Sequence, residues 1–400
     1  MSWTLGEAEE HLLSLELFGM RFGLERMRRL LTALGSPQER FRAVHVVGTN
    51  GKSSTVRFTA ALLEANGVKT GAYLSPHLTT FAERIRVGDR DLTAAEFGAA
   101  IQRAANAAAK VDRTSPDGER VTQFELLTAA AFDELARRGV EVAVIEAGLG
   151  GRFDATNVLG AEVVVLTNVG LEHTRWLGPT IADIAGEKLA VVKSSHPPAT
   201  LVLGDDSPEV LALAQATGAK IVRPASVGID APGYQRMNLG AAVAAAKAML
   251  GTPLLAAPIS LAVPGRLQVV DHDPLTIYDG AHNAPGIAAL AESVPQGTVA
   301  VLSVLDDKDA AAMLKALLPR LSAAVFTRAP NPRALSPATL ADLAAKVGPA
   351  VPGEIEPDPH KAVSRAREIA GEHGTVLATG SIYLVADLLS APGTRRASML

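Results

Sequence analysis

Short apolar runs alternate with longer periodic segments along most of this chain. Apolar residues dominate 44–47, 140–147 and 161–167, and between these runs apolar positions recur every three or four residues. Apolar runs of about four to eight residues are typical of strands buried on both faces, and the longer periodic segments are typical of helices. The alternation predicts right-handed βαβ units and a parallel sheet in the N-terminal half.

Helical periodicity is clearest over residues 24–35, 93–110 and 123–138. The first of these segments stops at Gly35, with a proline two residues beyond, which is how helices commonly end. A short strand is predicted within residues 69–77, where an apolar run stops at a Ser-Pro pair. The N-terminal half is therefore expected to be α/β.

A second alternation of apolar runs and helical segments begins near residue 276. Before it, the stretch PLLAAPISLAVPGRLQVV, around residues 255–270, holds three prolines and no helical periodicity, which predicts a hinge. We therefore expect two domains, residues 1–266 and residues 267–400, of which the second is a smaller α/β domain. Residues 390–400 have the composition of a mobile tail. The apolar runs of the second domain lie within residues 276–283, 299–309, 323–330 and 374–385.

The segment VHVVGTNGKSST, residues 44–55, joins an apolar strand to a helix through a glycine loop. Successive backbone N–H groups, the positive end of the helix dipole and the amine of Lys52 would converge there, which suits a polyphosphate. The spacing differs from the common G-x-x-x-x-G-K-[ST] pattern, because the leading glycine is Gly48. We predict an ATP site in which Ser53 and Ser54 serve as helix caps or as phosphate and metal ligands.

Polar side chains follow several of the predicted parallel strands directly. Ser75, Glu146 and His173 each come at or just after an apolar run, as the glycine loop does. Ligands of open parallel sheets bind outside the carboxyl ends of the strands, so these groups should gather beside the phosphates. A hydroxyl, a carboxylate and an imidazole in that place could hold Mg²⁺ together with water and phosphate oxygens. A loop-capping role for Glu146 and a packed loop position for His173 are the alternatives.

Other polar residues have simpler interpretations. Lys188 lies in a helical stretch where a single lysine is usually exposed, so the residue pattern predicts an inert surface position. His45 lies inside an apolar run and is predicted to be a core histidine. The segment GLGGRFDATN, residues 148–157, suits either a loop that approaches a ligand closely or a glycine-rich surface turn. In the second domain, YDGAHN, residues 278–283, follows a strand and would face a ligand or the first domain.

Composition narrows the class of protein. The chain has 38 Lys and Arg against 42 Asp and Glu, so nothing draws it toward nucleic acid or an anionic membrane, and any anion site must be local. The lack of cysteine excludes disulfides, thiolate nucleophiles and Cys-zinc sites, and fits a reducing compartment. No apolar run reaches the roughly 18 residues of a membrane span, and the first residues do not resemble a signal peptide. We expect a cytoplasmic protein.

Ordered motifs carry a more specific signal. The chain contains, in this order, GTNGKSS, YLSPHL, TQFE, GLGGRFDATN, GLEHTRWLG, GEK, PGR, DGAHN, DDKD and TGSIYL. This series resembles that of folylpolyglutamate synthases and dihydrofolate synthases, which belong to the Mur ligase superfamily of ATP-dependent amino-acid ligases. The resemblance covers nearly the whole chain. It implies an α/β protein with a P-loop ATPase domain built on a parallel sheet, and a smaller Rossmann-like C-terminal domain that closes over the substrates.

The resemblance also implies roles for individual residues. The ATP contacts it implies are Asn50, Gly51, Lys52, Ser53, Ser54, Asn238, Arg266 and Asp279. The Mg²⁺ ligands it implies are Ser75, Glu146 and His173. The pterin-side contacts it implies are Thr122, Phe124, Arg152, Asp154 and Ala155, with Phe124 as a stacking platform. Lys188 resembles the family's carbamylated lysine, which reverses the surface interpretation: as an anion it would ligand or orient a second Mg²⁺. Lys52, His173 and Lys188 are then the expected catalytic residues.

The implied reaction joins L-glutamate to dihydropteroate, to reduced folates, or to both. ATP would phosphorylate the acceptor carboxylate, because oxide is a very poor leaving group, and the amine of glutamate would then displace phosphate from the acyl phosphate. Mg²⁺ and Lys52 would offset charge on the phosphoryl group, and domain closure would exclude water. Ala155, where some members that only extend folates have serine, favours a bifunctional enzyme. We expect a monomer.

The chain departs from the family pattern at three positions. Ala284 follows DGAHN where proline is usual, Asp306 precedes DKD where histidine is frequent, and Ser53 replaces the commoner glycine after Lys52. Three other functions fit the sequence less well. Another Mur-type ligase would need a UDP-substrate domain before the strand that begins at residue 44. A small-molecule P-loop kinase leaves the second domain unexplained, and a non-catalytic nucleotide switch would be expected to lack Lys52 or Glu146.

Overall fold

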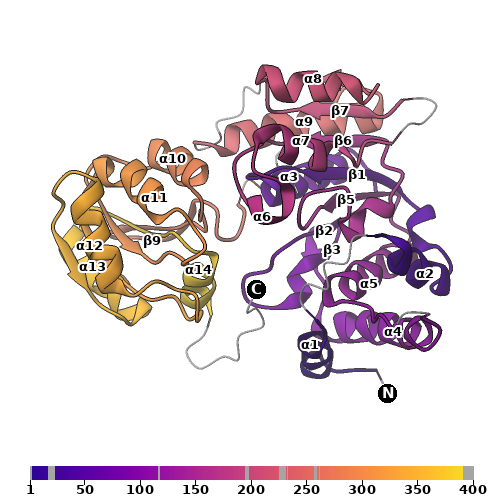
Figure 1. The fold of residues 1–400 in the computed structure, drawn as a ribbon, viewed down its shortest axis with the longest axis horizontal. Coiled ribbons are helices and arrows are strands. Elements are labelled where there is room, and N and C mark those ends of the chain that lie inside the picture. Colours follow the sequence, from indigo (N-terminus) through magenta and orange to yellow (C-terminus); the bar gives the residue numbers. More distant parts are fainter. Residues whose placement is uncertain are drawn as a thin grey trace.

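The computed structural model describes residues 2–16, 23–115, 118–193, 198–224, 231, 233–255, 259–260 and 262–390. Figure 1 shows two α/β units side by side, each a sheet with helices on both faces. Nearly all of the predicted tail, residues 391–400, lies outside the described residues, as do residues 256–258 and 261 of the predicted hinge.

The first unit contains an eight-stranded sheet with the order β4-β3-β2-β5-β1-β6-β7-β8. Its strands from β1 to β8 span Arg42–Val47, Thr70–Tyr73, Ile85–Val87, Arg90–Asp91, Val142–Glu146, Val163–Leu166, Thr200–Leu203 and Lys220–Val222. All neighbours pair in parallel except β3, which is antiparallel to β2 and β4. Val46 of β1 pairs with Glu146, and Val47 pairs with Leu166, so β1, β5 and β6 end at nearly the same level.

Helices cover both faces of this sheet. The helices from α1 to α9 span Leu5–Ser14, Glu25–Ala33, Lys52–Ala65, Ala94–Arg113, Gln123–Arg137, Thr174–Leu177, Ile181–Leu189, Pro208–Ala216 and Gln235–Leu250. The apolar sides of α3 and α9 form a buried cluster with one face of the sheet, and those of α1, α2, α4, α5, α7 and α8 form a second cluster on the other face. Strands buried on both sides explain the nearly continuous apolar runs of the sequence.

The second unit contains a six-stranded sheet with the order β13-β12-β11-β14-β10-β9. Its strands from β9 to β14 span Gln268–His272, Leu275–Tyr278, Thr298–Leu302, Leu321–Phe326, Gly353–Ile355 and Thr375–Thr379. Only the edge strand β9 is antiparallel to its neighbour. The helices from α10 to α14 span Ala284–Ser293, Ala310–Leu317, Pro337–Val347, Pro359–Ala370 and Ile382–Leu389, with α10 to α12 on one face and α13 and α14 on the other.

The predicted α/β class and the three predicted helices are confirmed. The predicted parallel sheet is confirmed from β2 to β8, and residues 85–91 add the antiparallel β3–β4 hairpin at its edge. Strands of two and three residues are too short to produce a periodic signal, so the sequence pattern did not indicate them. His45 is a buried core residue, as predicted, and its Nε2 atom lies 2.8 Å from Thr156 Oγ1.

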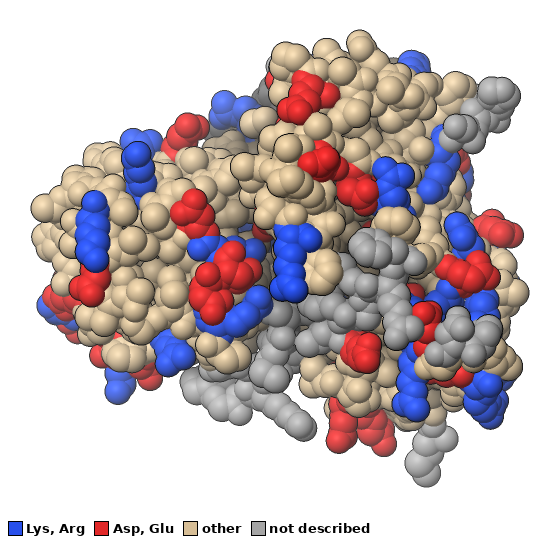
Figure 2. Space-filling view, in the orientation of Figure 1, with Lys and Arg blue, Asp and Glu red and all other residues tan. Residues whose placement is uncertain are grey.

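Charged residues of both signs are interspersed over the face of the molecule in Figure 2. This mixture agrees with the small net charge of −4 and leaves an anion site to local geometry. Within the described residues, no helix has both the length and the hydropathy required to cross a bilayer.

Candidate active site between a glycine loop and a second domain

The glycine loop joins β1 to α3 and leaves the start of that helix uncapped by any side chain. Gly51 is the residue before the helix, with φ of 83°, and Gly48 has φ of 149°. A Cβ atom on Gly48 would lie 1.9 Å from Thr167 Oγ1, and one on Gly51 would lie 2.2 Å from Asn238 Oδ1. Only glycine fits both positions, and the first N–H groups of α3 keep their capacity to bind an anion.

Two lysine amines converge on one carbonyl group of this loop. Lys52 Nζ donates to the carbonyl oxygens of Gly48 at 3.0 Å and Thr49 at 3.2 Å, and Lys188 Nζ donates to the same Gly48 oxygen at 2.9 Å. The residue pattern predicted an exposed Lys188, and this was wrong: the residue is only 5% exposed. Its helix, α7, packs its apolar side into the core and turns Lys188 toward the loop. Burial first, and the neighbouring Lys52 second, lower the pKa of Lys188 to about 7.

Glu146 is the last residue of β5 and is 1% exposed. Its carboxylate accepts a hydrogen bond from Ser53 Oγ at 2.9 Å and another from the backbone N–H of Ser75 at 3.2 Å. Burial raises the pKa of Glu146, and Lys52, Ser75 and Ser53 oppose that rise. Ser75 and Glu146 therefore lie together beside the glycine loop, as their positions at the ends of strands predicted.

His173 lies farther along the same edge of the sheet and contacts Glu172. Its φ of 52° is uncommon for a residue other than glycine, and the Nε2 atom lies 3.8 Å from Glu172 Oε1. Partial burial first, and the charges of Lys308 and Lys52 second, lower the pKa of His173 to about 4 against the opposing charge of Glu172. The imidazole is therefore neutral at physiological pH, which is the form that binds metals.

The residues predicted to contact the pterin lie around the glycine-rich segment 148–157. The Phe124 ring covers Gly148 so closely that a Cβ atom there would lie 2.6 Å from Phe124 Cζ, and its centroid lies 6.1 Å from that of Tyr73. Phe124 is half-buried and keeps part of its ring accessible. Thr122 is buried and caps α5 in a reciprocal pair with Glu125. Ala155 begins a buried 3-10 turn, Ala155–Val158.

Asp154 is engaged in building this loop. One carboxylate oxygen accepts from the backbone N–H groups of Gly148 at 2.9 Å and Leu149 at 2.8 Å, and the other accepts from the N–H and hydroxyl of Thr156. Burial raises the pKa of Asp154, and these hydrogen bonds oppose the rise. Arg152 is exposed and pairs with Glu187 at 2.8 Å on the surface, so the structure does not bring its guanidinium to Asp154 or Phe124 by a direct contact.

The remaining predicted ATP contacts lie where the two units meet. Asn238, on α9, packs against Gly51 of the glycine loop. Arg266 Nη1 donates to the Gly265 carbonyl at 3.0 Å and lies directly against Gly280. Asp279 is buried, and it accepts hydrogen bonds from the backbone N–H of Leu267 at 2.8 Å and from the Tyr234 hydroxyl.

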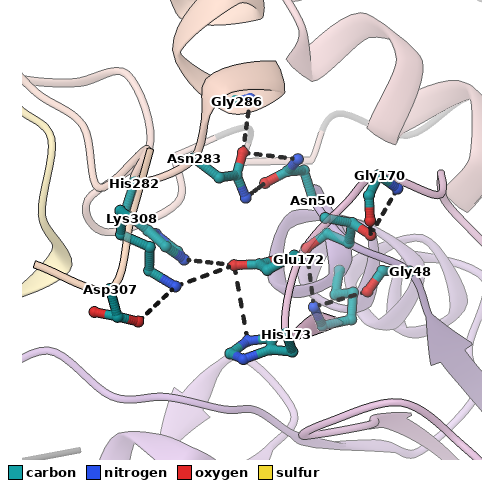
Figure 3. Close-up of polar contacts among 12 residues, drawn as sticks. Gly48, Asn50, Gly170, Glu172, His173, His282, Asn283, Gly286, Asp307 and Lys308 are labelled. Atoms are coloured by element: carbon teal, nitrogen blue, oxygen red, sulfur yellow. Dashed lines mark hydrogen bonds and ion pairs between the residues drawn. The ribbon is translucent and has the colours of Figure 1, made fainter. Parts of the chain in front are cut away.

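The two units also contact one another directly beside the loop. Asn50 and Asn283 form a reciprocal amide pair with N···O distances of 3.2 and 3.0 Å, and Asn283 also caps α10 by accepting from Gly286 N. Glu172 Oε1 lies 3.4 Å from His282 Nε2 and 3.6 Å from Lys308 Nζ, both of the second unit (Figure 3). Sequence reasoning did not single out Glu172, although its position directly before His173 in GLEH was a usable signal.

No three His, Asp and Glu side chains cluster as metal ligands in the part of the chain that the structure describes. A cation at this site would therefore depend on one carboxylate and one neutral imidazole, with hydroxyl, phosphate and water oxygens completing its shell, which suits Mg²⁺ better than Zn²⁺.

Two family patterns match the chain. The pattern described as "Mur ligase middle domain" matches residues 46–270, and "Mur ligase, glutamate ligase domain" matches residues 265–382. A "Dihydrofolate synthase/folylpolyglutamate synthase" of Bacillus subtilis is 32% identical, over 93% of this chain and 95% of that protein.

Solved structures with high similarity include ligand complexes. Folylpolyglutamate synthase of Mycobacterium tuberculosis complexed with ADP is 29% identical, with a TM-score of 0.87 over 98% of this chain and 99% of that one. Escherichia coli FolC in complex with DHPP and ADP is 27% identical, with a TM-score of 0.85 over 96% and 97% of the two chains. The Yersinia pestis enzyme complexed with AMPPNP and a Mn ion is 28% identical, with a TM-score of 0.83 over 96% and 97%.

Fold, site and comparisons together define a Mur-type ligase. Within that superfamily, the chain belongs to the dihydrofolate synthase/folylpolyglutamate synthase family.

The hydrogen bonds of Asp154 predict that Asp154→Asn lowers stability. An amide nitrogen cannot accept from the backbone N–H groups, so at least one buried donor loses its partner, at a cost of about 1–3 kcal/mol. Urea unfolding measures this loss, with Arg152→Gln as the control, since an exposed ion pair contributes about 1 kcal/mol or less. If the two variants were equally stable and Asp154→Asn only bound the pterin substrate more weakly, Asp154 would act by direct contact with that substrate instead.

Proposed function

We propose that this chain uses ATP to join L-glutamate to dihydropteroate and to reduced folylpolyglutamates, through an acyl phosphate. The activity is that of its family, an ATP-dependent glutamate ligase of the dihydrofolate synthase/folylpolyglutamate synthase type. The observation that carries the specific assignment is the buried carboxylate of Glu146, which is held by Ser53 and Ser75 beside an uncapped helix start.

The nucleotide is proposed to bind with its phosphates on the loop and the first turn of α3. Backbone N–H groups of Asn50 to Ser54 would face the phosphates, and Lys52 would leave the carbonyls of Gly48 and Thr49 to pair with them. Support comes from the glycine-only geometry and from the two amines that already surround the Gly48 carbonyl. Asn238, Arg266 and Asp279 are proposed to contact the rest of the nucleotide from the hinge side.

The acceptor is proposed to lie along the glycine-rich segment, with its pterin ring on Phe124. Support comes from the partly accessible Phe124 ring over Gly148 and from the contact of that ring with Tyr73, near the end of β2 that leads to Ser75. Thr122, Asp154 and Ala155 would shape this pocket, and Arg152 would lie at its rim. The complex of the similar Escherichia coli FolC with DHPP supports this class of acceptor.

The residues fit a divalent cation bound beside the phosphates. Glu146 is a buried carboxylate whose charge is only partly compensated by hydrogen bonds, and the imidazole of His173 is neutral. Ser75, Glu146 and His173 would hold Mg²⁺, which would supply charge neutralisation for the transferring phosphoryl group. The Mn ion in the complex of the similar Yersinia pestis enzyme supports a divalent metal.

The protein's own contribution to the chemistry is positioning and electrostatics. Lys52 would stabilise the negative charge that develops on the transferring phosphoryl oxygens, because its amine is held within reach of the loop. The amine of L-glutamate would then attack the acyl carbon, and phosphate would leave. The contacts of Asn283 and His282 across the loop support a closed arrangement that excludes water from the acyl phosphate.

We propose two domains, residues 1–266 and residues 267–400. This division is supported by the order of the elements, because α9 of the first unit ends at Leu250 and β9 of the second unit begins at Gln268. We also propose that the enzyme works as a monomer, because the described part of one chain supplies site residues from both domains. We propose a cytoplasmic location, because the lack of cysteine fits a reducing compartment.

The first prediction of this assignment concerns the substrates. With ATP, Mg²⁺ and dihydropteroate or tetrahydrofolate, the protein should release ADP over many turnovers only when L-glutamate is added, because the acyl phosphate formed together with ADP is consumed only when the amine attacks it. A coupled ADP assay and mass spectrometry of the products measure this. ADP release that ignores L-glutamate would instead support a kinase or a nucleotide switch.

The second prediction concerns Glu146. Glu146→Gln should keep the fold and lower turnover by about 100-fold or more, because the amide cannot replace the charge of the carboxylate beside the phosphates. Steady-state rates together with circular dichroism measure both properties. Wild-type turnover in a folded variant would exclude the metal role.

The third prediction concerns Lys188, which we propose is carbamylated and orients a second Mg²⁺. A pKa near 7 leaves much of the amine neutral at physiological pH, and a neutral amine reacts with CO₂. Activity should therefore rise with added bicarbonate, and more so as pH rises through 7. Lys188→Gln should be inactive and insensitive to bicarbonate. Native mass spectrometry that finds no carbamate in active enzyme would contradict this role.

A further inference from the structure

Glu172 lies between the two domains, close to the glycine loop. Its Oε1 atom is buried and makes no hydrogen bond within the described residues, yet it lies 3.4 Å from His282 Nε2, 3.6 Å from Lys308 Nζ and 3.8 Å from His173 Nε2. Figure 3 shows these side chains pointing at this single oxygen from both domains. A buried carboxylate oxygen without a hydrogen bond depends for its stability on a nearby positive group, which the ammonium of Lys308 supplies here.

The two partners from the second domain follow the strands on either side of β14. His282 comes four residues after β10, and Lys308 follows β11, so both stand at the carboxyl ends of their strands. Glu172 likewise follows β6 of the first sheet. The ion-pair cluster therefore holds the ligand-binding ends of the two sheets face to face.

Other contacts fix the orientation of these partners. The Nδ1 atom of His282 lies 2.8 Å from the Gly280 carbonyl oxygen, which turns Nε2 toward Glu172. Lys308 is also held by Asp307 at 3.3 Å, and only 13% of its side chain is exposed. Beside this cluster, the Asn50–Asn283 pair connects the glycine loop itself to the start of α10. His282 and Lys308 therefore approach Glu172 with defined geometry.

We propose that Glu172 is a positioning residue of the closed enzyme. Its carboxylate draws His282 and Lys308 to the phosphate loop, so that domain closure delivers two groups suited to the carboxylates of the incoming amino acid or to the acyl phosphate. The role of His282 and Lys308 toward these ligands rests on the ligase function proposed above, whereas the positioning by Glu172 does not.

The test compares Glu172→Gln with Glu172→Asp and with a matched control. Asp271→Asn is the control, because it removes a carboxylate from another ion pair, with Arg367 at 2.6 Å, on the far edge strand β9. Glu172→Gln should lower kcat/KM for L-glutamate by at least tenfold and leave the affinity for ADP within about twofold, since the nucleotide contacts stay intact. Glu172→Asp should recover part of the loss, and Asp271→Asn should behave as wild type.

Domain closure can be measured directly, because the chain contains no cysteine. Spin labels on Lys110→Cys in α4 and Lys346→Cys in α12, both exposed positions, report the distance between the domains by double electron–electron resonance. With ADP bound, wild type and Asp271→Asn should give one narrow distance, and Glu172→Gln should give a broader distribution. Lys308→Met should broaden the distance distribution in the same way. This second variant shows whether the broadening comes from loss of the ion pair or from a folding defect specific to position 172.

The outcomes separate the two levels of the proposal. Wild-type distances and wild-type kcat/KM in Glu172→Gln would overturn the positioning role. A broadened distance with an unchanged dependence on L-glutamate would overturn the link to the amino-acid step. If the wild-type protein itself showed no L-glutamate-dependent turnover, the proposed function would fail, while the distance measurement would still decide whether Glu172 holds the domains together.

Discussion

An anion site at the start of a helix requires N–H groups that nothing else occupies, and the rest of this molecule is arranged around that requirement. Gly48 and Gly51 adopt backbone conformations that put the loop directly against Thr167 and Asn238, where a Cβ atom has no room. No side chain caps α3. A capping residue at position 51 would stabilise the helix and close the site, so the chain gives up local helix stability to keep these donors available.

Buried charge around the loop follows from the same requirement. Lys52 and Lys188 share the carbonyl of Gly48, Glu146 is enclosed by Ser53 and Ser75, and Glu172 faces the second domain. Each of these charges would be costly if it stood alone in the interior. Around the loop, groups of opposite charge therefore lie close together, and we propose that a triphosphate and a divalent cation bind among them once Lys52 leaves the loop carbonyls.

The parallel sheets explain why residues so distant in sequence meet here. Because β1, β5 and β6 end at the same level, the loop, Glu146 and the segment that leads to Glu172 and His173 share one edge. Apolar runs and strand-end polarity carried this information, so the fold class and the contact of Glu146 with Ser75 were predictable. The pattern could not reveal that α7 turns Lys188 inward, because a single lysine in a helical segment gives the same sequence pattern whether its side chain is buried or exposed. It also could not reveal the pairing of Asn50 with Asn283 or of Glu172 with Lys308, since contacts between domains leave no periodic signal in either segment.

The central claim is that phosphates occupy the uncapped start of α3 and draw Lys52 away from the loop carbonyls. A crystal structure with AMPPNP and Mn²⁺ tests it most directly, since anomalous scattering locates the metal without ambiguity. We predict phosphate oxygens on the backbone N–H groups of residues 51–54, Lys52 paired with a phosphate, and the Mn²⁺ peak next to Ser75 and Glu146. Phosphates bound elsewhere, or a Lys52 that still donates to Gly48 and Thr49 while nucleotide is bound, would contradict the account.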